Sequence, residues 1–255
     1  MARVLVTGGT GTLGSRLVPC LAGRGHEVRT LSRHGPTHDA APGPAGVEHV
    51  RGDVRTGEGL ADAVAGMDAV IHAATSPRLE RAVEVGGTAN VVTTVATTGA
   101  HLVYVSIVGV DTMRFSYYRA KDAAEQVVES GDAPWTVQRA TQFHDLLDRF
   151  LGWRVFPVTR RLSFQPVDTA DVSERLADLV EAGPTGRAPD FGGPAVLSLR
   201  DLAAHRRRIT GSAALLVPVP AVGFLRDYDE GRHLCPDHAD GRRTWEQWLE
   251  ARSGS

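Results

Sequence analysis

Three glycines near the start of the sequence are spaced in a way that suits the binding of a diphosphate. Gly8, Gly11 and Gly14 form a G-x-x-G-x-x-G pattern between an apolar run and an amphipathic stretch. In such a turn glycine permits a tight bend, leaves room for an anion beside backbone N–H groups and lets the following helix pack close to a sheet. The helix N-terminus adds a positive dipole end. We therefore expect a bound dinucleotide, with contacts from Gly8, Thr10, Gly11, Thr12, Leu13 and Gly14.

The residues after the second apolar run indicate which dinucleotide is bound. Ser32 and Arg33 stand where a site selective for NAD carries an acidic residue for the ribose hydroxyls. Arg33 could instead form charge-assisted hydrogen bonds to a 2′-phosphate. NADP(H) is therefore the expected cofactor, with NAD(H) less favoured. A solvent-exposed arginine without a ligand is the plainer interpretation of Arg33.

Two more segments are expected to contact the cofactor. Asp53 and Val54 follow the third apolar run, and Asp53 could accept a hydrogen bond from the adenine amino group or cap a turn. Ala73, Ala74 and Thr75 follow the fourth run, at the carboxyl edge where open parallel sheets bind ligands.

These residues must be positioned by alternating strands and helices. Strands are expected at 3–7, 26–31, 47–50, 68–72, 102–105 and 135–138, and helices at 11–24, 59–65, 81–98 and 116–130. This α/β order predicts a Rossmann-type, doubly wound parallel sheet with helices on both faces. Further helices are expected at 169–182, 200–210 and 241–251, and a loop at 34–46. We expect one domain over 1–255, in which about 140–255 contributes a small C-terminal substrate lobe.

Composition excludes several kinds of partner. Lys+Arg 28 against Asp+Glu 30 gives a formal charge of -2, so nothing favours nucleic acid or an anionic membrane. Two cysteines cannot form a disulfide framework and suit the cytoplasm. The apolar runs are too short to span a bilayer. The ten histidines show no metal-ligand spacing, so no metal is expected.

Several segments, taken in order, resemble a known family. They are 7–14, 52–54, 68–74, 103–106, 117–121, 135–139 and 166–172. Together they resemble the atypical short-chain dehydrogenase/reductase superfamily, specifically its NmrA-like, NAD(P)-binding group. The resemblance spans residues 1 to about 179. Such proteins include quinone reductases, phenylpropanoid reductases and redox sensors that bind cofactor without turnover.

The resemblance implies that Tyr117 and Lys121 form the acid/base centre. They stand four residues apart on a predicted helix and so share one face. A nearby ammonium favours the phenolate, which lowers the tyrosine pKa from about 10 toward neutral pH. Lys121 could also hold the nicotinamide ribose, and Ser106, the third catalytic candidate, could hydrogen-bond the substrate oxygen. Ser106 and Tyr117 are only eleven positions apart, fewer than is usual, and Ile107 stands where relatives often have Ser or Thr.

Substrate contacts are expected just after the sixth strand. Gln142, Phe143 and His144 follow it and could line the pocket, although a packed histidine is the commoner outcome for His144.

These observations predict an NADPH-dependent oxidoreductase that transfers hydride to a carbonyl, quinone or enone of a small organic molecule. Two alternatives stay open: a non-catalytic NAD(P)-binding sensor of the NmrA type, and a non-redox isomerase or cyclase that retains the cofactor. The Tyr117 and Lys121 pair favours the enzyme, while the short segment before Tyr117 keeps the sensor open. The long helix at 81–98 could pair in a homodimer.

Overall fold

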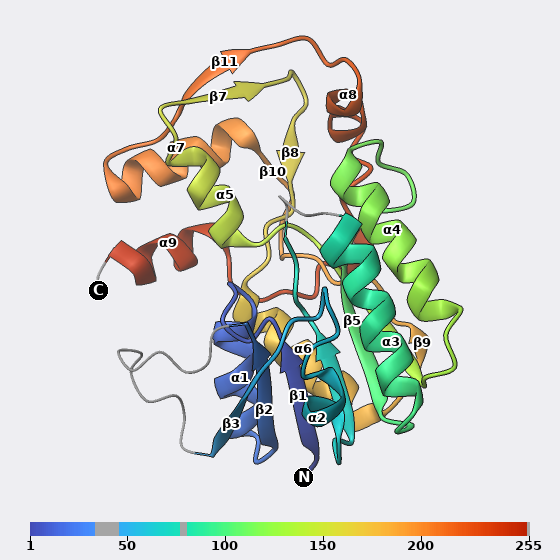
Figure 1. Cartoon of the computed structure of the whole chain (residues 1–255). Helices are drawn as coiled ribbons and strands as arrows, with labels where there is room; N and C mark the ends of the chain where they lie inside the picture. The colour runs from blue at the N-terminus through green and yellow to red at the C-terminus, as the bar shows by residue number, and fades with distance from the viewer. Residues whose placement is uncertain (34–45, 77–80, 254–255) are drawn as a thin grey trace. The chain divides into compact units, whose positions relative to one another are not determined.

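The computed structural model describes residues 1–33, 46–76 and 81–253 (Figure 1). The loop expected at 34–46 lies outside these ranges, apart from Gly46. The chain divides into two compact units. The first comprises Met1–Ser106, Ala120–Gln138 and Ser173–Ala188; the second comprises Ile107–Arg119, Arg139–Val172 and Pro189–Ser255. The stretch 173–188 thus belongs to the first unit and 107–119 to the second, and the substrate lobe expected over about 140–255 stays a prediction.

A seven-stranded sheet in the order β3-β2-β1-β4-β5-β6-β9 is the centre of the first unit (Figure 1). Its strands are β1 (Arg3–Thr7), β2 (Glu27–Ser32), β3 (Val47–Arg51), β4 (Ala69–His72), β5 (His101–Ile107), β6 (Trp135–Ala140) and β9 (Gly186–Arg187). β1 pairs in parallel with β2 on one side and with β4 on the other. The order of the strands therefore reverses between β1 and β4, which is where open α/β sheets bind their ligands. The predicted Rossmann-type sheet is confirmed.

Helices cover both faces of this sheet. They are α1 (Gly14–Gly23), α2 (Leu60–Val64), α3 (Thr88–Ala96), α4 (Ser116–Glu129) and α6 (Thr169–Ala182). One buried cluster joins α2, α3 and α4 to the sheet through residues such as Leu60, Val91 and Val128. Just after α1, Arg24 forms ion pairs with Glu174, Asp178 and Glu181 of α6 at 3.4, 2.8 and 2.9 Å.

The single helix predicted at 81–98 is two elements in the structure. A π-helix, η1 (Arg81–Gly87), precedes α3. Gly87 lies against the loop after β3, because a Cβ added there would be 3.2 Å from Cγ2 of Val54. Single π turns are rare and occur often at functional sites. Here the wider turn places Glu84 among buried groups, as described below.

The second unit has a separate core. Its elements are α5 (His144–Leu151), β7 (Val155–Val158), β8 (Ser163–Phe164), β10 (Leu197–Ser198), α7 (Leu199–Thr210), β11 (Leu215–Pro218), α8 (Phe224–Asp229), η2 (Pro236–His238) and α9 (Trp245–Ser253). Ser198 caps α7 by accepting a hydrogen bond from the N–H of Asp201 at 3.1 Å. α5, α7 and α9 bury their apolar faces together around Leu147, Leu202 and Trp245. Within the described ranges, no helix is both long and apolar enough to cross a bilayer.

His144 belongs to this core. Its side chain is fully buried, and its ring centre lies 5.7 Å from that of Trp245 and 5.5 Å from that of Trp248. Burial lowers the pKa of His144 to about 4, because the charged imidazolium would lose its hydration there.

The first residue of α1, Gly14, lies against the glycine turn and gives a first prediction. A Cβ at Gly14 would lie 2.2 Å from the carbonyl oxygen of Gly8 and 2.5 Å from Cα of Gly9, so the backbone would have to move. We expect Gly14→Ala to lower the free energy of unfolding by about 1–3 kcal/mol, as overpacking does. Gly23→Ala is the matched control on the same helix, since nothing lies within 4 Å of its Cβ position. Chemical denaturation of both variants checks this, and equal stability of the two would contradict it.

The buried histidine gives a second prediction. In the unfolded chain its pKa is about 6.5, so as pH falls the unfolded state takes up the proton first. Stability from neutral His144 is complete above about pH 6.5 and is lost between pH 6.5 and 4, by at most about 3 kcal/mol. We expect His144→Phe, which keeps a ring between the tryptophans, to lose less stability than the wild type when the pH is lowered from 6.5 to 4. Urea denaturation at pH 7.5 and pH 5 measures both, and an unchanged pH dependence in the variant would refute the assignment.

Candidate functional site

The glycine turn after β1 lies directly against the backbone that follows β4. Gly8 has a φ of +75°, and a Cβ there would be 2.8 Å from Cα of Ala74. The N–H of Ala73 donates to the carbonyl of Thr7 at 3.2 Å, which continues the pairing of the two strands past their ends. The tip of the turn, Thr10 to Thr12, is exposed. The turn is therefore a backbone-lined cradle at the sheet edge.

The start of α1 suits an anion. Leu13 occupies the N-cap position without a side-chain capping bond, and the first turn carries no acidic residue in this described segment. The first N–H groups of a helix have no partner inside the helix, and the helix dipole makes that end positive. A diphosphate would supply both acceptors and negative charge. The cradle at Gly8 and Gly14 and the uncapped helix thus fit the predicted dinucleotide.

An arginine-lined pocket lies over the ends of β2 and β3. Its lining residues are Arg33, Arg51, Gly52, Asp53 and Glu58. Gly52 fits closely there, because a Cβ would be 2.3 Å from the carbonyl oxygen of Glu58. Arg33 and Arg51 are exposed and so can reach a ligand phosphate. The second arginine was not singled out by the sequence, although it immediately precedes Gly52.

Asp53 and its neighbours have structural roles in this region. The carboxylate of Asp53 accepts the N–H of Arg55 at 2.9 Å, which is the turn role left open by the sequence. Val54 is buried, and its carbonyl accepts from the side-chain amide of Asn90 at 2.9 Å. The carbonyl of Ser32 accepts the N–H of Gly52 at 3.0 Å. Cofactor contacts by Ser32, Asp53 and Val54 stay predictions.

Lys121 is buried in the first unit with three well-defined partners. Its Nζ donates to the carbonyl of Val105 at 2.8 Å and to the hydroxyl of Tyr104 at 3.1 Å. The same atom lies 3.1 Å from Oε2 of Glu84. The lysine is thereby held at the carboxyl end of β5.

Glu84 is the acidic partner of this lysine. It is 1% exposed, and it accepts hydrogen bonds from the hydroxyl of Thr75 and from the N–H of Ser76. Burial by itself favours the neutral acid, but Lys121 and these hydrogen bonds together hold the pKa of Glu84 below its ordinary value. The pair is therefore charged. Neither Glu84 nor Tyr104 was identified as functional from the sequence; the available signal was an acid inside the apolar stretch 82–85.

His72 lies beside this pair at the end of β4. Its ring nitrogens contact the hydroxyls of Thr7 at 2.7 Å and Thr88 at 3.1 Å. Burial, with a smaller effect from Lys121, lowers the pKa of His72 to about 4. The imidazole is consequently neutral at physiological pH.

Ser106 presents a buried polar atom at the end of β5. The residue is 1% exposed, and among the described residues its Oγ has no hydrogen-bond partner. A buried hydroxyl left unpaired costs free energy, so such groups call for an explanation such as a ligand. Ser106 directly follows Val105, the residue whose carbonyl holds Lys121.

Tyr117 lies in the second unit, half-buried at the start of α4. Its ring meets that of Tyr118 edge-on, with ring centres 6.5 Å apart. Tyr117 and Lys121 share α4, as predicted, but the acid/base role of the tyrosine stays a prediction. Burial raises the pKa of Tyr118 well above its ordinary value, so Tyr118 stays protonated.

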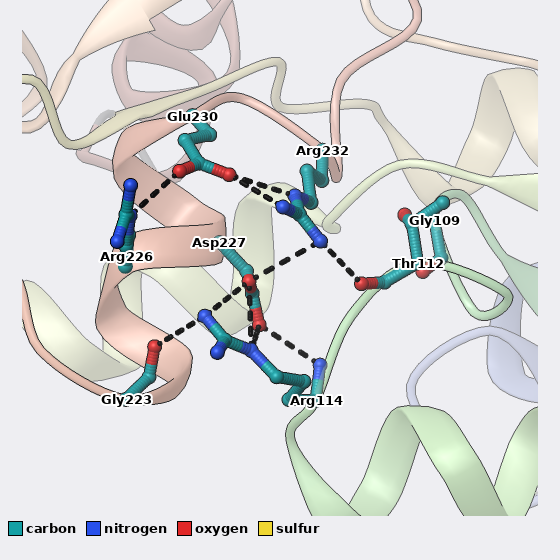
Figure 2. Close-up of polar contacts among 8 residues, drawn as sticks. All are labelled: Gly109, Thr112, Arg114, Gly223, Arg226, Asp227, Glu230 and Arg232. Atoms are coloured by element: carbon teal, nitrogen blue, oxygen red, sulfur yellow. Dashed lines mark hydrogen bonds and ion pairs between the residues drawn. The ribbon is translucent and has the colours of Figure 1, made fainter.

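The segment that leads into Tyr117 is held by a buried carboxylate in the same unit (Figure 2). Asp227 of α8 is fully buried and accepts from the backbone N–H of Arg114 at 2.9 Å and from its Nη2 at 2.8 Å. Arg232 Nη1 donates to the carbonyl of Thr112 at 3.1 Å. Hydrogen bonds from Arg114 hold the pKa of Asp227 below its ordinary value. This arrangement fixes the chain just before α4.

The three predicted substrate residues differ in their surroundings. Gln142 is buried and donates from Nε2 to the hydroxyl of Tyr118 at 3.2 Å. Phe143 is half-buried at the N-cap of α5. His144 is packed between Trp245 and Trp248, which is the alternative that the sequence left open. In the described ranges, no three His, Cys, Asp or Glu side chains gather as a metal site.

Comparison with curated proteins shows local similarity to steroid dehydrogenases. A 3-beta-hydroxysteroid dehydrogenase of Mycolicibacterium neoaurum is 45% identical over 74 residues, which are 29% of this chain and 19% of that protein. The human 3 beta-hydroxysteroid dehydrogenase type 7 is 37% identical over 135 residues, which are 46% of this chain and 37% of that protein. The chain thus matches less than two fifths of the length of either relative.

Solved structures share the fold over nearly the whole chain. The UDP-glucose 4-epimerase of Thermus thermophilus, in complex with NAD, has a TM-score of 0.74 at 20% identity, covering 99% of this chain and 98% of that one. A short-chain dehydrogenase/reductase superfamily protein from Agrobacterium tumefaciens with bound NAD has a TM-score of 0.72 at 21% identity, covering 99% and 96%. At these identities the likeness shows the Rossmann-type fold that the resemblance predicted. Because residues 8–182 match the NAD(P)H-binding family, the chain belongs to that family.

Proposed function

We propose that this protein transfers hydride from NADPH to a carbonyl, quinone or enone of a small organic molecule. The observation that carries the proposal is the Ser106 hydroxyl, which is buried and lacks a partner among the described residues. It stands at the carboxyl end of β5, the side of the sheet that also holds the glycine cradle. A hydroxyl in this position can donate to a substrate oxygen and polarise the adjoining carbon.

The chain's own residues have distinct roles in this proposal. When bound, the reduced nicotinamide supplies the hydride. The glycine turn and the start of α1 bind the diphosphate, and Lys121, fixed by Tyr104 and Val105, orients the nicotinamide ribose. Ser106 donates to the substrate oxygen, and Tyr117 delivers the proton that this oxygen acquires. Gln142 and Phe143 contact the substrate.

The curated relatives suggest which carbonyls to test first. Those proteins are named as 3-beta-hydroxysteroid dehydrogenases, so a ring ketone or the matching secondary alcohol is a substrate class to include. NADPH consumption should be followed with steroid ketones, quinones and enones. Turnover with one class would support the reductase. Binding of NADPH without oxidation in the presence of any of them would favour the sensor alternative.

The arginine-lined pocket predicts the choice of cofactor. We expect Arg33→Gln and Arg51→Gln each to weaken NADPH binding about tenfold while leaving NADH binding nearly unchanged, because each removes a charged donor for the 2′-phosphate. Isothermal titration calorimetry with both nucleotides measures this. Arg3→Gln is the control, because Arg3 is at the amino-terminal end of β1, away from the carboxyl ends of the strands where the pocket lies. Equal losses for NADPH and NADH would remove the phosphate role from these arginines.

The unpaired hydroxyl predicts a separation of binding from chemistry. Ser106→Ala should lower kcat about 100-fold, as loss of one oxyanion donor does, and leave the Kd for NADPH nearly unchanged. Ser130→Ala is the matched control, because the Ser130 hydroxyl donates to a carbonyl of the helix it follows at 3.3 Å. Steady-state kinetics and calorimetry supply the two readouts. A Ser106→Ala enzyme with wild-type kcat would exclude Ser106 from the reaction.

A further inference from the structure

The ion pair between Glu84 and Lys121 is buried and electrically neutral as a unit. The two side chains are 0% and 5% exposed, and Nζ lies 3.1 Å from Oε2. Each partner is also fixed by hydrogen bonds, Glu84 from Thr75 and Ser76 and Lys121 to Tyr104 and Val105. Because charges in a buried site are poorly screened by solvent, the sign of the field around this pair depends on both partners being present.

The position of the pair follows from the sheet. The diphosphate cradle lies after β1, and the arginine-lined pocket lies over β2 and β3. A dinucleotide that extends across the switch point must direct its other half over β4 and β5. Thr75 follows β4, and Val105 is in β5, so these contacts hold Glu84 and Lys121 on that side. Ala74, the residue before Thr75, packs under Gly8 of the cradle itself.

The two redox forms of the cofactor differ in charge at this end. The oxidised nicotinamide ring carries one positive charge, and the reduced ring is neutral. A lysine without a partner would repel the oxidised ring and leave the reduced ring almost unaffected. His72 is neutral in the wild type, since burial lowers its pKa to about 4, so the charge beside the ring is that of the pair.

We propose that Glu84 sets the relative affinity of the site for oxidised and reduced cofactor by neutralising the ammonium of Lys121. This inference rests on the proposed placement of the nicotinamide over β4 and β5. It makes Glu84 a positioning and charge-setting residue that need not touch the substrate. It also makes the direction of the reaction depend on a residue outside the predicted acid/base centre, because a site that tolerates the oxidised form supports alcohol oxidation as well as reduction.

The test is a four-protein comparison of equilibrium binding. Wild type, Glu84→Gln, Lys121→Met and the double variant are titrated with NADP+ and NADPH by calorimetry, and the ratio of the oxidised to the reduced Kd is the readout. The pair is neutral in the wild type and in the double variant, and it is positive in Glu84→Gln. In Lys121→Met it is negative when the hydrogen bonds from Thr75 and Ser76 keep Glu84 ionised at the pH of the titration. Glu27→Gln is the charge-matched control. Glu27 is exposed and is the first residue of β2, so it lies at the amino-terminal end of that strand, away from the carboxyl ends that hold the pair.

The ratio should follow the charge of the pair. We expect Glu84→Gln to raise it about tenfold, Lys121→Met to lower it by a similar factor, and the double variant to lie within about threefold of the wild type. An unchanged ratio in Glu84→Gln, or a shift in the same direction as Lys121→Met, would overturn the proposal. If Glu84→Gln does not fold, comparison of Lys121→Met with the double variant decides, because adding Glu84→Gln must then raise the ratio.

These outcomes are separate from those of the proposed function. If the ratio follows the charge but no carbonyl, quinone or enone is reduced, the hydride-transfer proposal falls and the role of Glu84 stands. If substrates are reduced and the ratio ignores the charge, the role of Glu84 falls alone.

Discussion

Two stretches of backbone meet at the switch point of the sheet with no space for a side chain between them. The turn after β1 and the segment after β4 approach so closely that a Cβ on Gly8 would lie 2.8 Å from Cα of Ala74. Gly14 closes the same turn from the side of α1. This approach fixes the start of α1, which is the positive end of the helix dipole, against the sheet edge. Thr75, one residue further, then connects the cradle to the buried pair of Glu84 and Lys121.

Lys121 of the predicted acid/base centre pairs with a carboxylate, which its spacing from Tyr117 did not predict. Four-residue spacing from Tyr117 implies an ammonium that lowers the phenol pKa. The structure gives that ammonium a carboxylate partner at 3.1 Å, which cancels much of its field. Removing one member of a buried pair costs about 3–5 kcal/mol, because the other charge is left without compensation. Lys121 is therefore better described as a fixed hydrogen-bond donor than as a source of positive potential.

The sequence predicted the sheet of the first unit well and the second unit poorly, for physical reasons. The strands β1, β4 and β5 are buried and mostly apolar, and glycines mark the turn after β1, so these strands could be recognised from local composition. The π-helix was missed because its residues fit an ordinary helical period, and the constraint at Gly87 comes from Val54, far away in sequence. Glu84 was missed because its partner, Lys121, lies on a different helix, α4.

In the second unit, short strands and small helices depend on distant contacts. β8 and β10 have two residues each and exist because they pair with each other. α5 was not predicted, and its first residue, His144, was assigned to the substrate pocket because only its position after β6 was known. Its partners, Trp245 and Trp248, are about 100 residues away in the sequence. The glycine turn was thus accessible from the sequence, whereas the packing around Gln142, Phe143 and His144 was not.

The short segment between Ser106 and Tyr117 bears on the choice between enzyme and sensor. Taken alone, the short segment would favour the sensor alternative, in which Ser106, Tyr117 and Lys121 do not act together in catalysis. Yet the segment is firmly held within the second unit: Val110 and Met113 are buried with Tyr118, and Asp227 binds the backbone and side chain of Arg114. A buried carboxylate is costly unless it is paired, so Asp227 requires Arg114 to stay in place. These contacts order the start of α4 within the second unit, although the segment before it is short.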